Sequence, residues 1–201
     1  MGPLQGYSMP RKDVLVVPLP AAAGDRALPP LSKEKNMTGR NKKTMTTPQK
    51  ITKPFYFEDF HVGQKFVTNA RTVTEADVVN FAGLSWDHNP LHTDEVYSAK
   101  TGFGKRIAHG LLGVLMHSGL AYQLTEGTLL AFLDFTWQFK LPIYIGDTIH
   151  VEQVVTELRD SSKEGRGILT FEKKIINQRN EVVQTGTTTI LLAKRTYKPT
   201  A

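Results

Sequence analysis

Asp87 and His92 are the residues of this chain best suited to proton transfer, and they lie five positions apart in a run that reads Ser-Trp-Asp-His-Asn-Pro-Leu-His. A regular helix does not bring side chains at this separation together. Pro90 lacks a backbone N–H and disfavours the helical region for Asn89, so we expect a turn of fixed geometry between them. Such a turn can direct a carboxylate and an imidazole at one water molecule, as general acid–base catalysis requires.

Gly110 opens a long apolar stretch and is a candidate oxyanion donor. A glycine at the start of a helix leaves a free amide, lets a substrate oxygen approach closely, and lies where the helix dipole favours negative charge. Addition of water to an α,β-unsaturated thioester needs groups that position and deprotonate the water, an acid for the α-carbon, and a donor for an enolate-like oxygen. Asp87, His92 and Gly110 can supply these functions.

The elements that must position these residues follow from the hydrophobic pattern. A strand is expected over 64–73. Thr74-Glu75-Ala76-Asp77 has the form of a capping box and predicts an amphipathic helix that ends near Trp86. A second short helix is expected over 94–100. From Gly110 to Leu124 the apolar residues surround nearly the whole circumference of a helix, which predicts burial on all sides.

The remainder of the sequence predicts four antiparallel strands, over 129–140, 148–158, 167–177 and 181–194. In the last of these, apolar and polar residues alternate with the period of two that is typical of a strand. One buried helix, several long strands, and helices placed before the main sheet indicate an α+β domain.

Residues 1–50 and 51–201 differ in composition. The first fifty residues hold 9 Lys and Arg against 3 Asp and Glu, whereas the rest holds 16 of each, so the formal net charge of +6 lies in the first segment. That segment is rich in Pro, Lys, Arg, Thr and Ala and predicts a disordered basic tail before a single domain over 51–201. A neutral folded part argues against a nucleic-acid partner.

The absence of cysteine excludes disulfides and thiolate metal sites. It is compatible with a reducing cytoplasm, which is the location we expect. The most apolar stretch, 110–124, is about 15 residues long and interrupted by polar side chains, which is too short for a bilayer. No membrane span is expected.

Two segments resemble the MaoC-like, (R)-specific enoyl-CoA hydratase and dehydratase family. They are Phe-Ala-Gly-Leu-Ser-Trp-Asp-His-Asn-Pro-Leu-His-Thr-Asp over 81–94 and Phe-Gly-Lys-Arg-Ile-Ala-His-Gly-Leu-Leu over 103–112. The Asp, the Asn-Pro pair and the His recur at fixed spacing in that family, and the His-Gly pair follows at the expected distance. The resemblance spans roughly 55–195. It implies the hot-dog fold, in which a curved antiparallel sheet wraps one long central helix.

The resemblance implies reversible hydration of 2-enoyl-CoA or carrier-protein thioesters to 3-hydroxyacyl thioesters, without a cofactor, in a homodimer or larger homo-oligomer. It makes Asp87 and His92 the catalytic pair and the amide of Gly110 the oxyanion donor. Asn89 would hold the turn, and Ser118 aligns with a serine that in some members lies beside the catalytic pair.

Several other polar residues have competing interpretations. Many family members have a small Gly where this chain has Trp86, so the ring either narrows the acyl pocket or packs beneath the turn, and substrate choice depends on which. Lys105 and Arg106 are candidates for the phosphates of CoA or of a carrier-protein arm, although two basic residues also suit a solvated face. His109 is expected to hold its loop by a hydrogen bond, and His117 to be buried with its hydrogen bonds satisfied.

A metal site is not expected, because Pro90 separates His88 from His92 and the sequence offers no obvious third ligand. Two other functions remain open on the same fold. One is an acyl-CoA thioesterase, in which a carboxylate directs water at the carbonyl carbon. The other is a catalytically silent binding module, against which the joint presence of Asp87, His92 and Gly110 argues.

Overall fold

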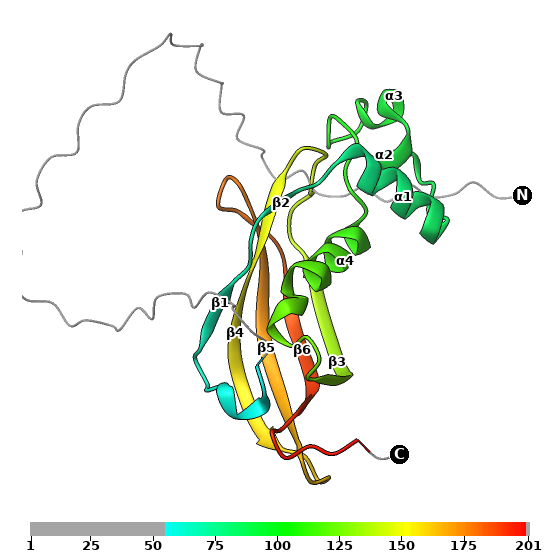
Figure 1. The fold of residues 1–201 in the computed structure, drawn as a ribbon. Coiled ribbons are helices and arrows are strands. Elements are labelled where there is room, and N and C mark those ends of the chain that lie inside the picture. The colour runs from blue at the N-terminus through cyan, green and yellow to red at the C-terminus, as the bar shows by residue number, and fades with distance from the viewer. Residues whose placement is uncertain (1–54, 200–201) are drawn as a thin grey trace, which may run out of the picture. The chain divides into compact units, whose positions relative to one another are not determined.

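The computed structural model describes residues 55–199, which form an antiparallel sheet with a helix against one face. Its elements in chain order are η1 (Phe57–Asp59), β1 (Lys65–Val67), β2 (Arg71–Thr72), α1 (Glu75–Ser85), α2 (Pro90–Thr93), α3 (Glu95–Ser98), α4 (Gly110–Ala121), η2 (Tyr122–Leu124), β3 (Leu129–Phe139), β4 (Thr148–Asp160), β5 (Arg166–Asn177) and β6 (Val182–Ala193). The strand order is β1-β4-β5-β6-β3, and β2 also pairs with β4 (Figure 1). The predicted basic tail over 1–50 lies outside the described residues.

The four long strands predicted for the second half of the sequence are confirmed as β3, β4, β5 and β6, with ends shifted by at most two residues. All of their pairings are antiparallel. In β5 the side chains of Leu169, Phe171 and Ile175 are buried, whereas those of Glu172 and Lys174 are exposed. This alternation gives the sheet one face toward the core, as the predicted α+β class requires.

The single strand expected over 64–73 is instead two short strands, β1 and β2, which pair with successive parts of β4. Thr68 lies between them. Its N–H donates to the carbonyl of Val151 at 3.0 Å, but its side-chain hydroxyl accepts the Val151 N–H at 3.0 Å. A side-chain oxygen thus replaces the backbone acceptor, and this interrupts the regular ladder.

The capping box that predicts α1 is confirmed. The Thr74 side chain accepts the N–H of Asp77 at 3.2 Å, and the Asp77 carboxylate accepts the N–H of Thr74 at 2.9 Å. The helix ends at Ser85, and Trp86 follows in the left-handed region at φ 62°. The short helix α3 falls within the predicted range 94–100.

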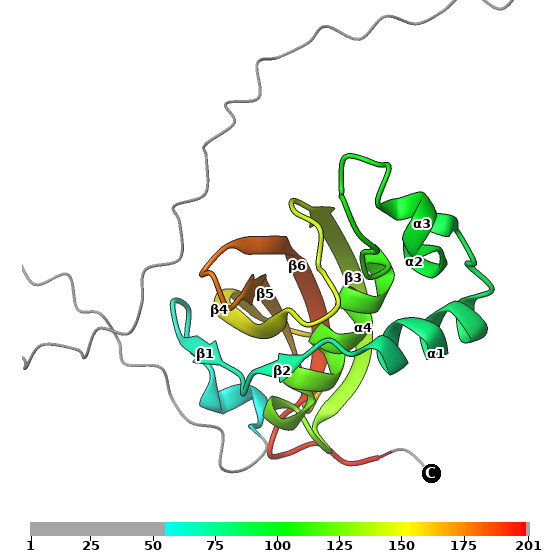
Figure 2. The same cartoon turned by 90° about the horizontal axis from the view of Figure 1, so that it is seen from above.

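The helix α4 lies across the inner face of the sheet, which curves around it (Figure 2). Leu112 and Met116 pack there in one core cluster with Ile149, Ile175 and Val183. A second cluster lies farther along the sheet, around the buried Phe residues near η1 and β5. The helix is thus held mainly by apolar contacts on one side.

The prediction that α4 is buried on all sides is wrong. Leu111 is 63% exposed and Leu115 is 54% exposed, because the sheet covers only one side of the helix. The helix also ends at Ala121, three residues before the predicted end, and continues as the short turn η2. Within residues 55–199, no helix is both long enough and apolar enough to cross a membrane.

The strands β6 and β3 pack closely at Gly186, and a substitution there tests this packing. A Cβ at this position would overlap the carbonyl oxygen of Thr136 and the ring of Trp137. We expect Gly186→Ala to lower the free energy of unfolding by about 1–3 kcal/mol, because backbone must move to admit the methyl group. Urea unfolding followed by circular dichroism measures this change.

The matched control is Gly83→Ala in α1, where a Cβ meets nothing within 4 Å. Alanine favours the helix over glycine by about 0.5–1 kcal/mol, so this variant should be as stable as the wild type or more so. Equal effects of the two substitutions would contradict the packing assigned to Gly186.

Candidate active site

The run from Asp87 to His92 forms a turn that starts where α1 ends. The backbone of Trp86 is in the left-handed region and turns the chain away from the helix. The N–H of Asp87 then donates to the Ser85 hydroxyl at 3.3 Å. The Asn89 side chain then accepts the N–H of Leu91 at 3.0 Å and caps the short helix α2. Pro90 occupies the first position of that helix, where its missing N–H costs nothing. Local hydrogen bonds therefore hold the whole turn.

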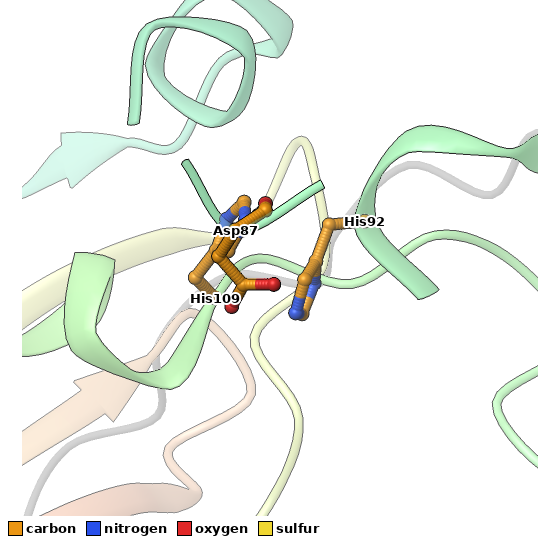
Figure 3. Close-up of side chains that lie close together, drawn as sticks. All are labelled: Asp87, His92 and His109. Carbon is orange, nitrogen blue, oxygen red and sulfur yellow. The ribbon is translucent and has the colours of Figure 1, made fainter. Parts of the chain in front are cut away.

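The turn brings the carboxylate of Asp87 and the ring of His92 together (Figure 3). The Asp87 carboxylate is exposed and accepts the N–H of Asn89 at 3.2 Å. His92 Nδ1 lies 2.8 Å from the carbonyl oxygen of Ile107. Since a carbonyl oxygen only accepts, Nδ1 must carry the proton, and Nε2 is left with a lone pair. His92 is therefore oriented as a base at Nε2.

His109 is a third member of this cluster. Its Nε2 lies 2.9 Å from the carbonyl oxygen of Asp87, so the predicted loop-holding hydrogen bond is confirmed. Its ring also stacks on that of His92, with centroids 3.8 Å apart. Burial lowers the pKa of the His109 imidazole, which is only 2% exposed. A neutral His109 supports the turn without adding a charge to it.

Asp87, His92 and His109 each offer a potential metal-ligand atom, and these atoms lie within 4.8 Å of one another. From the sequence, only His88 and His92 formed a candidate pair of metal ligands. His109 was missed as a third ligand because it is 17 positions beyond His92, although it is adjacent to His92 in space. A carboxylate and two imidazoles are ligands that zinc accepts. The expectation of a metal-free site therefore needs a direct test by chelation.

Gly110 lies at the first position of α4, where the first N–H groups of a helix have no intrahelical partner. The N-cap residue His109 provides no side-chain cap. The nearest atom to a Cβ added at Gly110 would be in the ring of Phe139, 2.9 Å away, so a larger residue would press on this ring. On the other side, the buried Gln184 donates from Nε2 to the Gly110 carbonyl at 3.0 Å.

A pocket of about 300 Å³ joins the turn to the start of α4. His92, Gly110 and Gln184 line it together with Phe139, and its remaining wall comes from the Phe103–Ala108 loop and from residues 140–143. The pocket is mainly apolar, with the imidazole and the helix amide at one side. This composition suits a short acyl group with one polar end.

The structure does not gather every predicted site residue here. Ser118 lines two other pockets farther along α4. The Trp86 ring is 85% exposed, so it does not pack beneath the turn. The ammonium of Lys105 lies 4.6 Å above the ring of Tyr144, whose hydroxyl donates to the carbonyl of Phe103 at the pocket wall.

Arg106 makes structural ion pairs. Its guanidinium binds both carboxylate oxygens of Glu75 at 2.7 Å and one oxygen of Glu95 at 2.8 Å. These contacts tie the loop before α4 to α1 and α3. They occupy the donors that a phosphate would need, so we do not assign Arg106 to a phosphate site.

Gln184 holds Gly110 in place through a network that can be tested by a double-mutant cycle. Its Oε1 accepts from Trp137 Nε1 at 2.9 Å while its Nε2 binds the Gly110 carbonyl. We expect Gln184→Leu to lower the free energy of unfolding by about 1–3 kcal/mol, since it leaves the partly buried indole N–H unpaired. In the background of Trp137→Phe the same substitution should be less destabilising, and additive effects would contradict the network.

Comparisons with known proteins agree on one family. The profile of the MaoC like domain matches residues 59–175. The (R)-specific enoyl-CoA hydratase of Aeromonas caviae is 36% identical over 135 residues, which are 67% of this chain and 97% of that protein. The crystal structure of a MaoC-like dehydratase from Rhodospirillum rubrum is 27% identical, with a TM-score of 0.64 over 71% of this chain and 99% of that one.

A Mycobacterium tuberculosis protein with a double hot-dog fold gives a TM-score of 0.64 at 23% identity, over 74% of this chain and 47% of that one, which is a likeness of fold alone. The described sheet and its central helix match this fold, so the hot-dog prediction is confirmed. The chain belongs to the MaoC-like domain family.

Proposed function

We propose that this chain catalyses the reversible hydration of 2-enoyl thioesters to 3-hydroxyacyl thioesters. The observation that carries the proposal is the closeness of Asp87 to His92, which lines a pocket together with Gly110, the uncapped first residue of α4. The A. caviae relative is named for hydration of this kind.

In the proposed reaction, water adds its oxygen to the β-carbon and a proton to the α-carbon. The lone pair at His92 Nε2 takes a proton from the water, and the Asp87 carboxylate orients the same water by accepting its other hydrogen. The N–H of Gly110 donates to the thioester oxygen, on which negative charge develops as the enolate forms. The proton held at His92 then passes to the α-carbon, so no proton is lost or gained overall.

The proposed chemistry uses only side-chain and backbone groups and needs no cofactor. Lys105, beside the pocket wall, is the proposed contact for a phosphate of the thioester carrier, because its ammonium has no ion-pair partner within residues 55–199. We retain the cytoplasm as the proposed compartment on the basis of the cysteine-free sequence.

The catalytic pair is tested with Asp87→Asn and His92→Ala. Each variant removes an acid–base group from an exposed or half-buried position, so we expect a folded protein. Hydration of crotonyl-CoA, followed by loss of the 2-enoyl absorbance, should fall by a factor on the order of 10²–10⁴. His88→Ala is the matched control, because His88 is exposed in the same turn, and it should retain most of the turnover.

The same assay separates the competing functions. Release of free thiol without loss of the enoyl group would indicate a thioesterase, and no change in either signal over a panel of acyl-CoAs would indicate a silent module. Prior dialysis against EDTA should leave the rate unchanged if Asp87, His92 and His109 act without a metal. A rate that falls with EDTA and returns with zinc would replace the proposed mechanism by a metal-assisted one.

We also propose that the chain forms a homodimer through β3. This strand lies at the end of the sheet and pairs only with β6 among the described strands. Its large apolar residues Leu129, Phe132, Leu133, Phe135 and Phe139 are between 38% and 57% exposed. The exposed face of α4 adds Leu111 and Leu115. A long apolar edge strand needs a cover, and a second copy offers a matching strand.

Light scattering after size-exclusion chromatography should therefore give the mass of a dimer for the wild type. Leu133→Lys places a charge in the proposed interface and should shift the protein toward the monomer. Val62→Lys is the control, because Val62 is 62% exposed just before β1, near the opposite edge of the sheet. A wild-type monomer, or equal effects of both substitutions, would refute the β3 interface.

A further inference from the structure

A second pocket lies farther along α4, between the last turns of that helix and the sheet. Its volume is about 330 Å³, and it shares no lining residue with the pocket of His92 and Gly110. Most of its wall is apolar and comes from Leu124, Leu129, Phe132, Phe171 and Ile190. Three buried polar side chains, Lys173, Gln153 and His117, also line it.

Lys173 lies in the middle of the inner face of the sheet. It pairs in register with Gln153 on β4 and with Gly186 on β6, so these positions share one face. The lysine is only 7% exposed. Within residues 55–199 its ammonium makes no hydrogen bond or ion pair, and it lies 5.2 Å from the centroid of the Phe171 ring. Gly186 offers no side chain that could reach it.

Gln153 and His117 each have a side-chain nitrogen, Nε2, without a hydrogen-bond partner. Gln153 is 1% exposed, and its Nε2 donates to no group in the described part of the chain. His117 is 1% exposed, and its Nε2 is likewise unpaired. The prediction that His117 is buried is confirmed, but the prediction that its hydrogen bonds are satisfied is wrong, because only Nδ1 has a partner, the carbonyl of Val114 at 3.3 Å.

The buried polar groups of Lys173, Gln153 and His117 lower the stability of the fold when the pocket is empty, because they lack partners. Burial lowers the pKa of Lys173 to about 8, which means that the buried site disfavours the charged ammonium. Burial, and then the charge of Lys173, lower the pKa of His117 to about 3. An apolar residue in place of Lys173 would remove this penalty. An unpaired cation at the wall of a pocket is a group that a bound anion can pair.

We propose that this pocket binds a carboxylate carried on an apolar chain, with Lys173 and Gln153 as the donors to its two oxygens. The single positive charge matches the single negative charge of a carboxylate. The surrounding leucine, isoleucine and phenylalanine side chains suit the apolar chain of the ligand. A phosphate would need more hydrogen-bond donors than this pocket offers. Neutral His117 carries its proton on Nδ1, so its Nε2 can accept from the ammonium and orient it.

One carboxylate is already present at this pocket, that of Glu126. It belongs to an exposed residue of the segment between η2 and β3, and it forms no ion pair with Lys173 within the described residues. Lys173 remains available to a ligand, and Glu126 adds negative charge near the opening that disfavours a dianion more than a monoanion.

Two sources can supply such a carboxylate. One is a free carboxylic acid with an apolar chain. The other is the distal carboxylate of an acyl group whose thioester end is bound at the active site, and this source rests on the proposed hydratase function. Gly110 and His117 are seven residues apart on α4, which corresponds to roughly 10 Å along the helix, a distance that a medium-length acyl chain spans.

The first experiment titrates the full chain with hexanoate by isothermal calorimetry at pH 7. We expect binding by the wild type, at least tenfold weaker binding by Lys173→Met, and at least tenfold weaker binding of hexanamide than of hexanoate to the wild type. Lys174→Met is the matched control, because Lys174 is the next residue of β5, points to the exposed face and pairs with Glu172 at 3.5 Å. It should bind hexanoate within twofold of the wild type.

The second experiment compares hydration of 2-octenoyl-CoA with that of its counterpart carrying a terminal carboxylate. If the acyl group supplies the carboxylate, Lys173→Met should lower kcat/KM for the carboxylated substrate at least tenfold and leave crotonyl-CoA turnover unchanged. A loss of hexanoate binding alone indicates a free carboxylate. The carboxylate-site proposal is overturned if Lys173→Met changes neither hexanoate binding nor kcat/KM for the carboxylated substrate. A wild type that hydrates no thioester contradicts the proposed hydratase function, and the hexanoate titration then decides the carboxylate-site proposal alone.

The Lys173→Met variant should fold, because the substitution removes a buried unpaired charge that lowers the stability of the wild type. A loss of binding by this variant therefore does not result from unfolding. We expect the variant to unfold at a higher urea concentration than the wild type at pH 7. The gain should shrink as the pH rises from about 8 toward 10.5, because the folded lysine loses its proton over this range while the unfolded lysine still holds it. A variant less stable than the wild type would contradict the unpaired state assigned to Lys173.

Discussion

The site depends on the close approach of the first turn of α4 to the sheet. A Cβ at Gly113 would overlap the side chain of Gln184, and one at Gly110 would press on the ring of Phe139. Because both positions are glycine, the carboxamide of Gln184 fits between helix and sheet and binds the Gly110 carbonyl. The helix therefore presents its uncapped amides at the pocket wall, where a larger residue would push it away.

His109 joins this helix to the turn that carries Asp87 and His92. Its backbone is the N-cap position of α4, while its side chain binds the carbonyl of Asp87 and stacks on His92. One buried, neutral ring thus fixes the distance between the start of the helix and the turn. Arg106 strengthens the same connection from outside through Glu75 and Glu95. Preorganisation of this kind is what the proposed proton transfer needs.

The two ends of α4 differ in chemical character. The first turn faces a pocket with an imidazole and a free amide, whereas the last turns face a pocket with a buried ammonium. In both places polar groups in apolar surroundings lack internal partners, which lowers stability and is typical of ligand sites. The hot-dog fold of the MaoC-like family places both pockets along one helix, so one extended ligand, or two separate ones, can contact them.

The sequence by itself determined the local features. The capping box of α1, the Asn-Pro turn and the four long strands depend on neighbouring residues, and so they were predicted at nearly the observed positions. Pairing of Asp87 with His92 was predictable for the same reason. The tertiary structure decided what depends on distant residues: the exposed side of α4, the arrival of His109 beside His92, the ion pairs of Arg106 and the unpaired Lys173. These features could not be read from the sequence, because a residue's burial and partners are set by strands and loops that meet only when the sheet closes around the helix.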